Sequence, residues 1–439
     1  MRATFEKAVV WEIKAECLTP LRTGIVDGDT ETVLRSHDGT AMVQGSSIAG
    51  CLRSWIEQST YKDRSNALFG SQETAGPLRI SDGMFEKNSE MLIRPRLKMD
   101  GITGTAEDKK KFDLAHIQTG SYFSFTVTLL GNDISQDVTA LEAALSALDC
   151  GDITMGAQKT NGFGRVKLAE VKKCSLDLKN PKDRDAWLND EFPWDDSFTL
   201  PTMERTAKAV FTVVGTFENL LVKSPQTESF MVDDTNRDLT VNLREGDKPV
   251  LPGSSIKGAL RARVEKIAKY MGLSEKLIES VFGTNPKRKT AVGEDGEIKK
   301  LSPGKVICRD VYLSGQKSAK ISRIRINKFT GGVMRQALFT EEPVSGKVTL
   351  KISVESGCRA GCALVLYALR DLGLGLWNLG SNGSIGRGFL KVREISASVP
   401  DGRQLKLVFS ESDGRTVCKA EDPSHLAEDW IKALKEEKA

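Results

Sequence analysis

One nine-residue phrase occurs twice in the chain and constrains the fold more than any other feature. GSSIAGCLR at Gly45 to Arg53 returns as GSSIKGALR at Gly253 to Arg261, 208 positions later, with every glycine, serine, leucine and arginine at the same spacing. A match of that length in one register indicates a tandem duplication, and internal repeats decide the architecture before any single element does. The chain of 439 residues has room for two domains of roughly 200 residues each.

Further landmarks recur in the same order in both halves. They are the turns Ala67 to Gly70 and Ser280 to Gly283, the short strands that run toward Asp82 and Asp310, the segments Ile93 to Lys98 and Ser322 to Asn327, the alternating strands Ser121 to Leu130 and Lys347 to Val354, the helices Leu141 to Leu148 and Cys362 to Leu372, and the glycine-rich loops Met155 to Leu168 and Leu379 to Val392. Within the loops, Gly164-Arg165 is expected to match Gly386-Arg387. This mixture of strands and helices predicts an α+β, ferredoxin-like sandwich in each half.

The pattern divides the chain into residues 1–175 as a first domain, 176–206 as a linker, 207–398 as a second domain, and 399–439 as a tail with a short helix. The linker is polar and contains proline, and Trp187 and Trp194 are expected to pack it against a neighbour. In the tail, Asp422-Pro423 can cap a helix whose apolar residues include Leu426 and Trp430. That helix is expected to dock on the chain's own core, with a partner subunit as the alternative.

The composition is that of an ordinary globular protein, with 39% hydrophobic and 28% charged residues. The net charge of +4 permits contact with nucleic acid without requiring it, because a nucleic-acid footprint is a local patch of charge. Charged residues interrupt the N-terminal sequence, and the longest apolar run is too short to cross a bilayer. We therefore expect a cytoplasmic protein with no membrane contact and with its eight cysteines reduced.

A CxxxC spacing at Cys358 and Cys362 raises the question of zinc. Zinc requires four ligands, and the three histidines, His37, His116 and His425, form no companion cluster in the sequence. We exclude a structural zinc and expect both thiols to be buried in a strand.

Each copy of the repeated phrase predicts a helix start suited to an anion. Glycine lets the backbone bend closely, the serines can cap, and the first N–H groups of the helix point outward without partners. The predicted set is Gly45, Ser46, Ser47 and Arg53 in the first copy, and Gly253, Ser254, Ser255, Lys257 and Arg261 in the second. An ordinary helix start is the alternative, but recurrence together with basic residues favours a site for a backbone phosphate.

The glycine-rich loops could also approach a ligand backbone closely. Lys159, Arg165 and Arg387 supply positive charge there. Hairpin turns collect glycine as well, so the loops alone do not separate a binding loop from a turn. Neither loop has a Walker or dinucleotide-binding pattern.

Together, the glycine-serine phrase, the LFG-type turn and the C-terminal GxGR loop resemble the RAMP superfamily, the RNA-binding backbone subunits of CRISPR effector complexes. The most similar group is the backbone subunit of type III complexes. Because both halves resemble it, the chain is similar to a fused double backbone subunit of the type III-D branch. The resemblance implies two tandem ferredoxin-like, RRM-like domains with thumb insertions, binding to CRISPR RNA and target RNA, and assembly with other type III effector subunits.

That family cuts target RNA at regular intervals, using a loop aspartate and a divalent metal in each subunit. The resemblance implies Asp29 in the first half, sixteen positions before the glycine-serine turn, with Asp27 in reserve. In the second half it implies Asp238, fifteen positions before the turn, with Asp233 and Asp234 in reserve. Asp29 and Asp238 would hold the metal, Mg²⁺ or Mn²⁺. These aspartates are equally good turn formers, so which halves cut stays open.

The segment Ile324 to Phe339 resembles the thumb of the family, with Arg325, Lys328, Thr330 and Met334 facing RNA by analogy. The first half departs from this pattern. Ala49 also stands where the second copy has Lys257, which implies a weaker grip on RNA in the first copy or a site completed by a neighbour.

Three functions are consistent with the sequence. The leading one is a guide-binding backbone subunit that cuts target RNA. A non-catalytic RNA-binding backbone subunit is the nearest alternative. The third is an endoribonuclease that processes the CRISPR precursor, which the scarcity of histidine and the fusion of two backbone-like copies disfavour.

Overall fold

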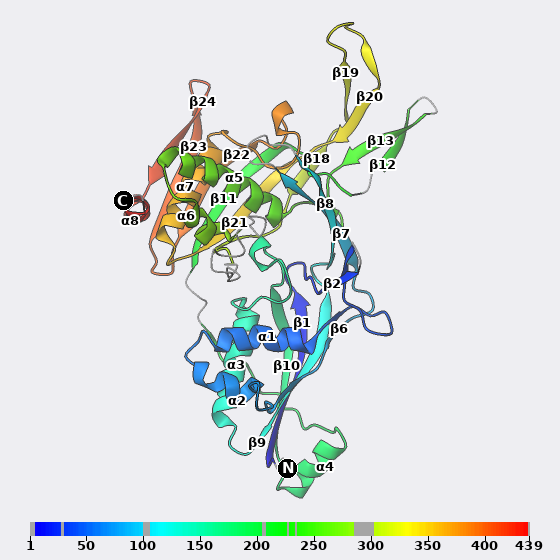
Figure 1. The fold of residues 1–439 in the computed structure, drawn as a ribbon, viewed down its shortest axis with the longest axis vertical. Helices are drawn as coiled ribbons and strands as arrows, with labels where there is room; N and C mark the ends of the chain where they lie inside the picture. The colour runs from blue at the N-terminus through cyan, green and yellow to red at the C-terminus, as the bar shows by residue number, and fades with distance from the viewer. Residues whose placement is uncertain are drawn as a thin grey trace, which may run out of the picture. The chain divides into compact units, whose positions relative to one another are not determined.

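The computed structural model describes residues 5–27, 30–99, 106–203, 208–225, 228–232, 235–284 and 303–437. The chain forms two compact units. The first comprises Met1–Leu97, Lys109–Lys159 and Phe163–Thr206, and the second comprises Lys98–Asp108, Thr160–Gly162 and Ala207–Ala439. Both are mixed α+β, which confirms the predicted class (Figure 1).

The first unit is built on a six-stranded antiparallel sheet in the order β10-β1-β9-β6-β4, with β5 also paired to β9. Its strands are β1 (Lys7–Cys17), β4 (Met42–Val43), β5 (Leu78–Ile80), β6 (Gly83–Phe85), β9 (Tyr122–Gly131) and β10 (Val166–Asp177). Helices α1 (Gly45–Ile56) and α3 (Ser135–Cys150) bury apolar residues, such as Ile48, Leu52 and Leu145, against Trp11 and Ile13 of β1. Helix α2 (Ser65–Phe69) contains the leucine and phenylalanine of the LFG-type turn, and Gly70 follows its end.

The second unit repeats this plan with a seven-stranded sheet in the order β16-β21-β11-β22-β23-β24, and β18 also pairs with β21. The strands are β11 (Lys208–Leu220), β16 (Val306–Cys308), β18 (Ser314–Ser318), β21 (Val344–Glu355), β22 (Leu390–Ser398), β23 (Gln404–Ser412) and β24 (Arg415–Glu421). Its helices are α5 (Gly253–Met271), α6 (Glu275–Phe282) and α7 (Arg359–Gly373). Four strands correspond between the two sheets: β10-β1-β9-β5 in the first unit and β22-β11-β21-β16 in the second. By position in the chain, both sets lie in the order last, first, third, second. This shared order is what the sequence repeat forms in the structure.

Each unit also carries a smaller four-stranded sheet. One has the order β2-β3-β8-β7 and the other β12-β13-β20-β19, so the two are topologically alike. The strands are β2 (Gly24–Asp27), β3 (Thr30–Val33), β7 (Met91–Met99) and β8 (Ala106–Ile117), and β12 (Glu228–Val232), β13 (Thr235–Val241), β19 (Ile321–Ile326) and β20 (Val333–Glu342). Strands β14 (Arg244–Glu245), β15 (Lys248–Leu251) and β17 (Val311–Tyr312) complete the second unit.

The tryptophans after β10 pack as predicted. Trp187 of helix α4 (Pro181–Leu188) lies 6.1 Å from Phe192 between ring centroids, and Phe192 lies 5.5 Å from Trp194. This aromatic group packs against the buried Ala8 and Leu176 of the first sheet. The two tryptophans therefore pin the segment to the first unit.

The C-terminal segment extends the second unit. The hairpin β23–β24 adds two strands to the sheet, which the sequence patterns did not reveal. Helix α8 (Leu426–Glu436) buries Trp430, whose ring lies 5.4 Å from that of Phe211, and Asp422 accepts hydrogen bonds from the N–H of Leu426 at 2.9 Å and of Ala427 at 2.7 Å. The helix docks on the chain's own core, as predicted.

The prediction that Cys358 and Cys362 lie in a strand is wrong. Cys358 precedes α7 and Cys362 lies in its first turn, both buried. Burial raises the pKa of the Cys362 thiol to about 12, as expected of a thiol packed in an apolar core.

Candidate nucleic-acid interface

The two repeated helices begin alike, but without the predicted serine caps. The residue before each helix is extended and offers no side-chain cap. Instead, the N–H of Gly45 donates to Asp82 Oδ1 at 2.7 Å, and the N–H of Gly253 donates to Asp310 Oδ1 at 2.7 Å. In both units an aspartate thus occupies the first amide and supplies the negative charge that a helix start favours.

The repeated serines lie within the first turn. The N–H groups of Ser47 and Ser255 donate to the carbonyl of the residue before each helix, at 2.9 Å in both cases. Among the described residues, the N–H groups of Ser46 and Ser254 find no acceptor. Each helix start therefore offers one open amide to an anion, fewer than the sequence suggested.

Packing explains why glycine recurs at these starts. A Cβ added to Gly45 would overlap the carbonyl oxygen of Ile80, and one added to Gly253 would overlap that of Cys308. These residues end β5 and β16, and Asp82 and Asp310 stand two positions after them. The sequence signal for the two capping aspartates was their recurrence after the same short strand.

The repeated arginines connect each helix to the LFG-type turn. Arg53 donates to Glu57 Oε1 at 2.9 Å and to Asn66 Oδ1 at 3.2 Å. Arg261 donates to Glu265 Oε1 at 2.8 Å and to the carbonyl oxygen of Gly283 at 3.3 Å. Both guanidinium groups therefore have structural partners, and contact of either with phosphate stays a prediction.

The side chain of Lys257 lies on the buried face of α5 and not on the outer face of the helix. The residue is 8% exposed. Burial lowers the pKa of Lys257 to about 8, the nearby Cys308 thiol opposes this shift, and Arg261 adds to it. The replacement of Ala49 by Lys257 in the second copy therefore changes the interior of the unit rather than its surface.

We expect Lys257→Met to stabilise the protein at neutral pH and the gain to disappear in alkali. The unfolded lysine titrates near 10.5 and the folded one near 8, so burial of the charged form costs about 3 kcal/mol below pH 8. Between these two pKa values the unfolded state keeps a proton that the folded state has released, so the free energy of unfolding of the wild type rises with pH relative to the variant. Urea unfolding at about pH 7 and about pH 10 measures this difference, with the exposed Lys266→Met as control. A gain independent of pH would contradict the assignment.

The two glycine-rich loops share one hydrogen-bond pattern. The N–H of Met155 donates to the carbonyl of Gly164 at 2.8 Å, and the N–H of Leu379 donates to that of Gly388 at 3.0 Å. Gly164 therefore corresponds to Gly388 and not to Gly386. The predicted alignment of the loops is wrong by two residues.

This shift changes the partners of the loop arginines. Arg165 corresponds to Phe389, and Arg387 corresponds to Phe163, so the two arginines are not equivalent. Both the Nε and the Nη2 of Arg387 donate to Glu341 Oε1, at 3.0 and 2.8 Å. Arg165 is partly buried, with its Nε beneath Gly151.

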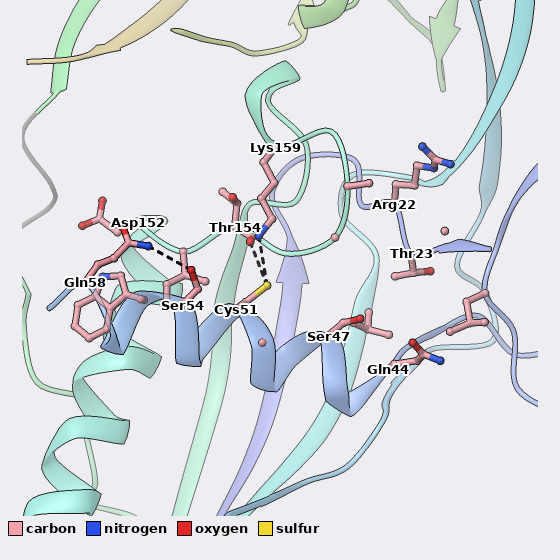
Figure 2. A pocket seen from close by; sticks show the side chains of 18 residues that line it. Arg22, Thr23, Gln44, Ser47, Cys51, Ser54, Gln58, Asp152, Thr154 and Lys159 are labelled. Carbon is pink, nitrogen blue, oxygen red and sulfur yellow. Dashed lines mark hydrogen bonds between the residues drawn. The ribbon is translucent and has the colours of Figure 1, made fainter. Parts of the chain in front are cut away.

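A cavity of ≈ 510 Å³ opens between the outer face of α1 and the first glycine-rich loop (Figure 2). Ser47, Cys51 and Ser54 line it from one face of the helix, where small side chains leave the groove open. Lys159 reaches into it from the loop, and its Nζ lies 3.5 Å from Cys51 Sγ. Arg22 lies at the end nearer the start of α1. The structure thus brings the predicted Ser47 and Lys159 to one surface, and adds Arg22, which no motif marked.

Of the predicted catalytic residues, Asp238 alone has a described side chain. It lies on β13, is exposed, and pairs with Ser229 across the β12–β13 hairpin. Asp29, Asp233 and Asp234 lie outside the described residues. The backbone of Asp27 ends β2, and its side chain also lies outside the described set.

The thumb-like hairpin β19–β20 is exposed and partly apolar. Arg325 and Lys328 are both solvent-exposed, and their contact with RNA stays a prediction. Phe329 at the turn is 98% exposed, and Ile326 and Met334 are also exposed. Exposed aromatic and basic side chains on one hairpin are typical of surfaces that stack on nucleic acid.

Across the part of the chain that the structure describes, no group of three or more His, Cys, Asp or Glu residues could hold a metal ion. None of the helices in that part is long and apolar enough to span a membrane. All eight cysteines lie within it and are free thiols.

Comparison with known proteins identifies the family. The RAMP superfamily matches residues 14–167 and 220–391, the two copies of the repeat. No protein of curated function matches the sequence. Among solved structures, the chain is similar to a chain of the cryo-EM structure of the Type III-B Cmr-beta bound to cognate target RNA, with 14% identity and a TM-score of 0.32. That similarity covers 38% of this chain and 61% of the other. The two matched regions together span most of the sequence, and the chain belongs to the RAMP superfamily.

Proposed function

We propose that this protein is a backbone subunit of a type III CRISPR effector complex, similar to the fused subunits of the type III-D branch, which binds CRISPR RNA and cuts complementary target RNA. The observation that carries the RNA-binding part is the groove of ≈ 510 Å³, where the repeated helix and the glycine-rich loop meet. Membership in the RAMP superfamily supports it. The shared strand order of both units supports two tandem ferredoxin-like, RRM-like domains.

The chemistry of the groove suits an RNA backbone. Lys159 provides an exposed cation, the largely buried Arg22 adds positive charge at one end, and Ser47, Ser54 and Thr154 provide hydroxyl groups along its length. Contacts of this kind position a nucleic acid without reading its sequence. This suits a protein that must accept guides of any sequence.

We expect Lys159→Ala to weaken binding of CRISPR RNA and to reduce its salt dependence. A cation that neutralises one phosphate contributes about 0.7 to the slope of log affinity against log salt for single-stranded RNA. The slope should fall by about that amount, and the exposed Lys87→Ala serves as control. Filter binding over a range of salt concentrations measures both slopes. If the Lys159→Ala slope equals that of the wild type, the groove is not the guide site.

For cutting, we propose that the loop aspartates act on the ribose 2′-OH. That hydroxyl attacks its own phosphodiester once a splayed nucleotide is held in line, so positioning supplies much of the rate. Asp238 is exposed on β13 and can accept the 2′-OH proton as a general base. We assign the same role in the first half to Asp29, with Asp27 as its reserve, and Asp233 and Asp234 are the reserves for Asp238 in the second half.

In the alternative form of this proposal, the Asp238 carboxylate would hold a divalent cation, Mg²⁺ or Mn²⁺, instead of accepting the proton, and Asp29 would do so in the first half. Mg²⁺ in such sites is commonly bound by one or two carboxylates together with phosphate oxygens of the substrate, so the lack of a protein cluster among the described residues is compatible with it. When bound, the ion would stabilise negative charge on the phosphate.

The precursor-processing alternative has a direct test. The isolated protein is incubated with unprocessed repeat RNA and no other subunit. We expect no cleavage, because the proposed subunit works within a complex on guide-paired RNA. Specific cleavage at the repeat would favour the processing enzyme instead.

A further inference from the structure

A buried carboxylate joins three segments of the second unit. Glu341 of β20 is 2% exposed. Its Oε1 accepts from Arg387, and its Oε2 accepts from Asn382 Nδ2 at 2.9 Å and from Arg323 Nη2 at 3.4 Å. Asn382 and Arg387 belong to the glycine-rich loop, and Arg323 belongs to β19. Both oxygens have donors, which a buried charge requires.

The same residue lies beside the strand that carries Asp238. β13 and β20 run parallel, and Thr240 pairs with Glu341. Asp238 lies two residues before Thr240 on β13. Just beyond β13, Asn242 Nδ2 donates to the carbonyl oxygen of Glu342 at 2.9 Å. β13 therefore pairs with β20 just C-terminal to Asp238. At the same position, Glu341 of β20 accepts hydrogen bonds from the glycine-rich loop.

The first unit builds this junction without the buried carboxylate. Leu114 is the residue of β8 that pairs with β3, as Glu341 pairs with β13. Phe163 stands in the loop where the second unit has Arg387, and its ring lies 5.5 Å from that of His116. The Arg94 guanidinium also lies 5.5 Å from the Phe163 ring. The junction recurs in the fold, and its ionic form belongs to the second unit.

We propose that Glu341 is a positioning residue, which holds the strand of Asp238 in place relative to the glycine-rich loop through Arg387 and Asn382. This inference rests on the proposed function, because it holds that the buried Glu341 carboxylate keeps Asp238 aligned with the bound guide. It also gives Arg387 a role other than binding phosphate. Its guanidinium donates to Glu341, so other residues would bind the RNA backbone.

The first test needs neither guide nor target. Hydrogen exchange of the amides from Leu239 to Val241 is compared in the wild type, Glu341→Gln, Arg387→Gln and the double variant. We expect exchange at least about tenfold faster in each single variant, because removal of one partner of a buried pair loosens what it holds. The double variant should be no faster than the singles, since the two residues act through one another. The neighbouring Glu342→Gln, whose carboxylate accepts from Ser318, is the matched control and should leave exchange unchanged.

The second test uses the assembled complex with its guide. Glu341→Gln should slow the cut of the second unit by about tenfold, with the cut of the first unit and the affinity for guide unchanged. Unchanged exchange in Glu341→Gln, or additive effects in the double variant, would overturn the proposal. So would a loss of guide affinity equal to the loss of cutting, because Glu341 would then shape the guide site alone. If the wild-type complex cuts nothing, the proposed function fails, and the exchange measurement still decides the role of Glu341.

Discussion

Gly388→Ala is expected to lower the free energy of unfolding of the second unit by about 4 kcal/mol. Two effects combine. Gly388 has a φ of 73°, and an alanine in that left-handed region costs about 1–2 kcal/mol. A Cβ would also overlap the carbonyl oxygen of Leu379, whose N–H bonds to Gly388 at 3.0 Å, and relief of such a backbone clash costs about 1–3 kcal/mol more. Urea unfolding of the purified variant measures the sum.

The same loop contains a matched control. Gly386 has a φ of 83°, but nothing lies within 4 Å of a Cβ added there. Gly386→Ala should therefore show the left-handed cost alone, about 1–2 kcal/mol. Equal losses in the two variants would show that the close approach to Leu379 contributes nothing. The difference matters for function, because it assigns Gly388 to the fold of the loop rather than to a ligand.

The repeat in the sequence predicted most of the architecture. The nine-residue phrase located α1 and α5, and period-two alternation located β9 and β21. These signals succeed because burial of one face imposes a period on the sequence. The sequence does not predict the β23–β24 hairpin, because the hairpin has no counterpart in the first half and both faces of β24 are largely exposed.

The candidate site was less predictable, since its details depend on contacts distant in sequence. The sequence predicts that the serines cap the helices, but Asp82 and Asp310, more than thirty positions away in the chain, accept from the first amides. It predicts that Lys257 faces RNA, but the helix directs that side chain inward. It pairs Arg387 with Arg165, and only the hydrogen bonds of the loops reveal the two-residue shift. Local pattern identifies residue types, whereas their partners are set by the tertiary packing.

Loss of a single cut is the largest effect that we expect. Removal of a general base lowers the rate of such a step by about 10²–10⁴-fold, so Asp238→Ala should abolish one cut in a guide-matched target. Asp29→Ala should abolish a different cut, because the two halves act at successive positions. The exposed Asp247→Ala, in the turn between β14 and β15, is the control and should leave every cut in place.

The most direct measurement is therefore a map of target cleavage at single-nucleotide resolution, made on the assembled complex with each of these variants. Guide occupancy is measured in the same samples, so that a loss of assembly is distinguished from a loss of chemistry. We predict that Asp238→Ala removes one cut while the guide stays bound and the remaining cuts persist. Retention of every cut in both Asp238→Ala and Asp29→Ala, with the guide bound, would contradict the assignment of target cleavage to this protein's loop aspartates.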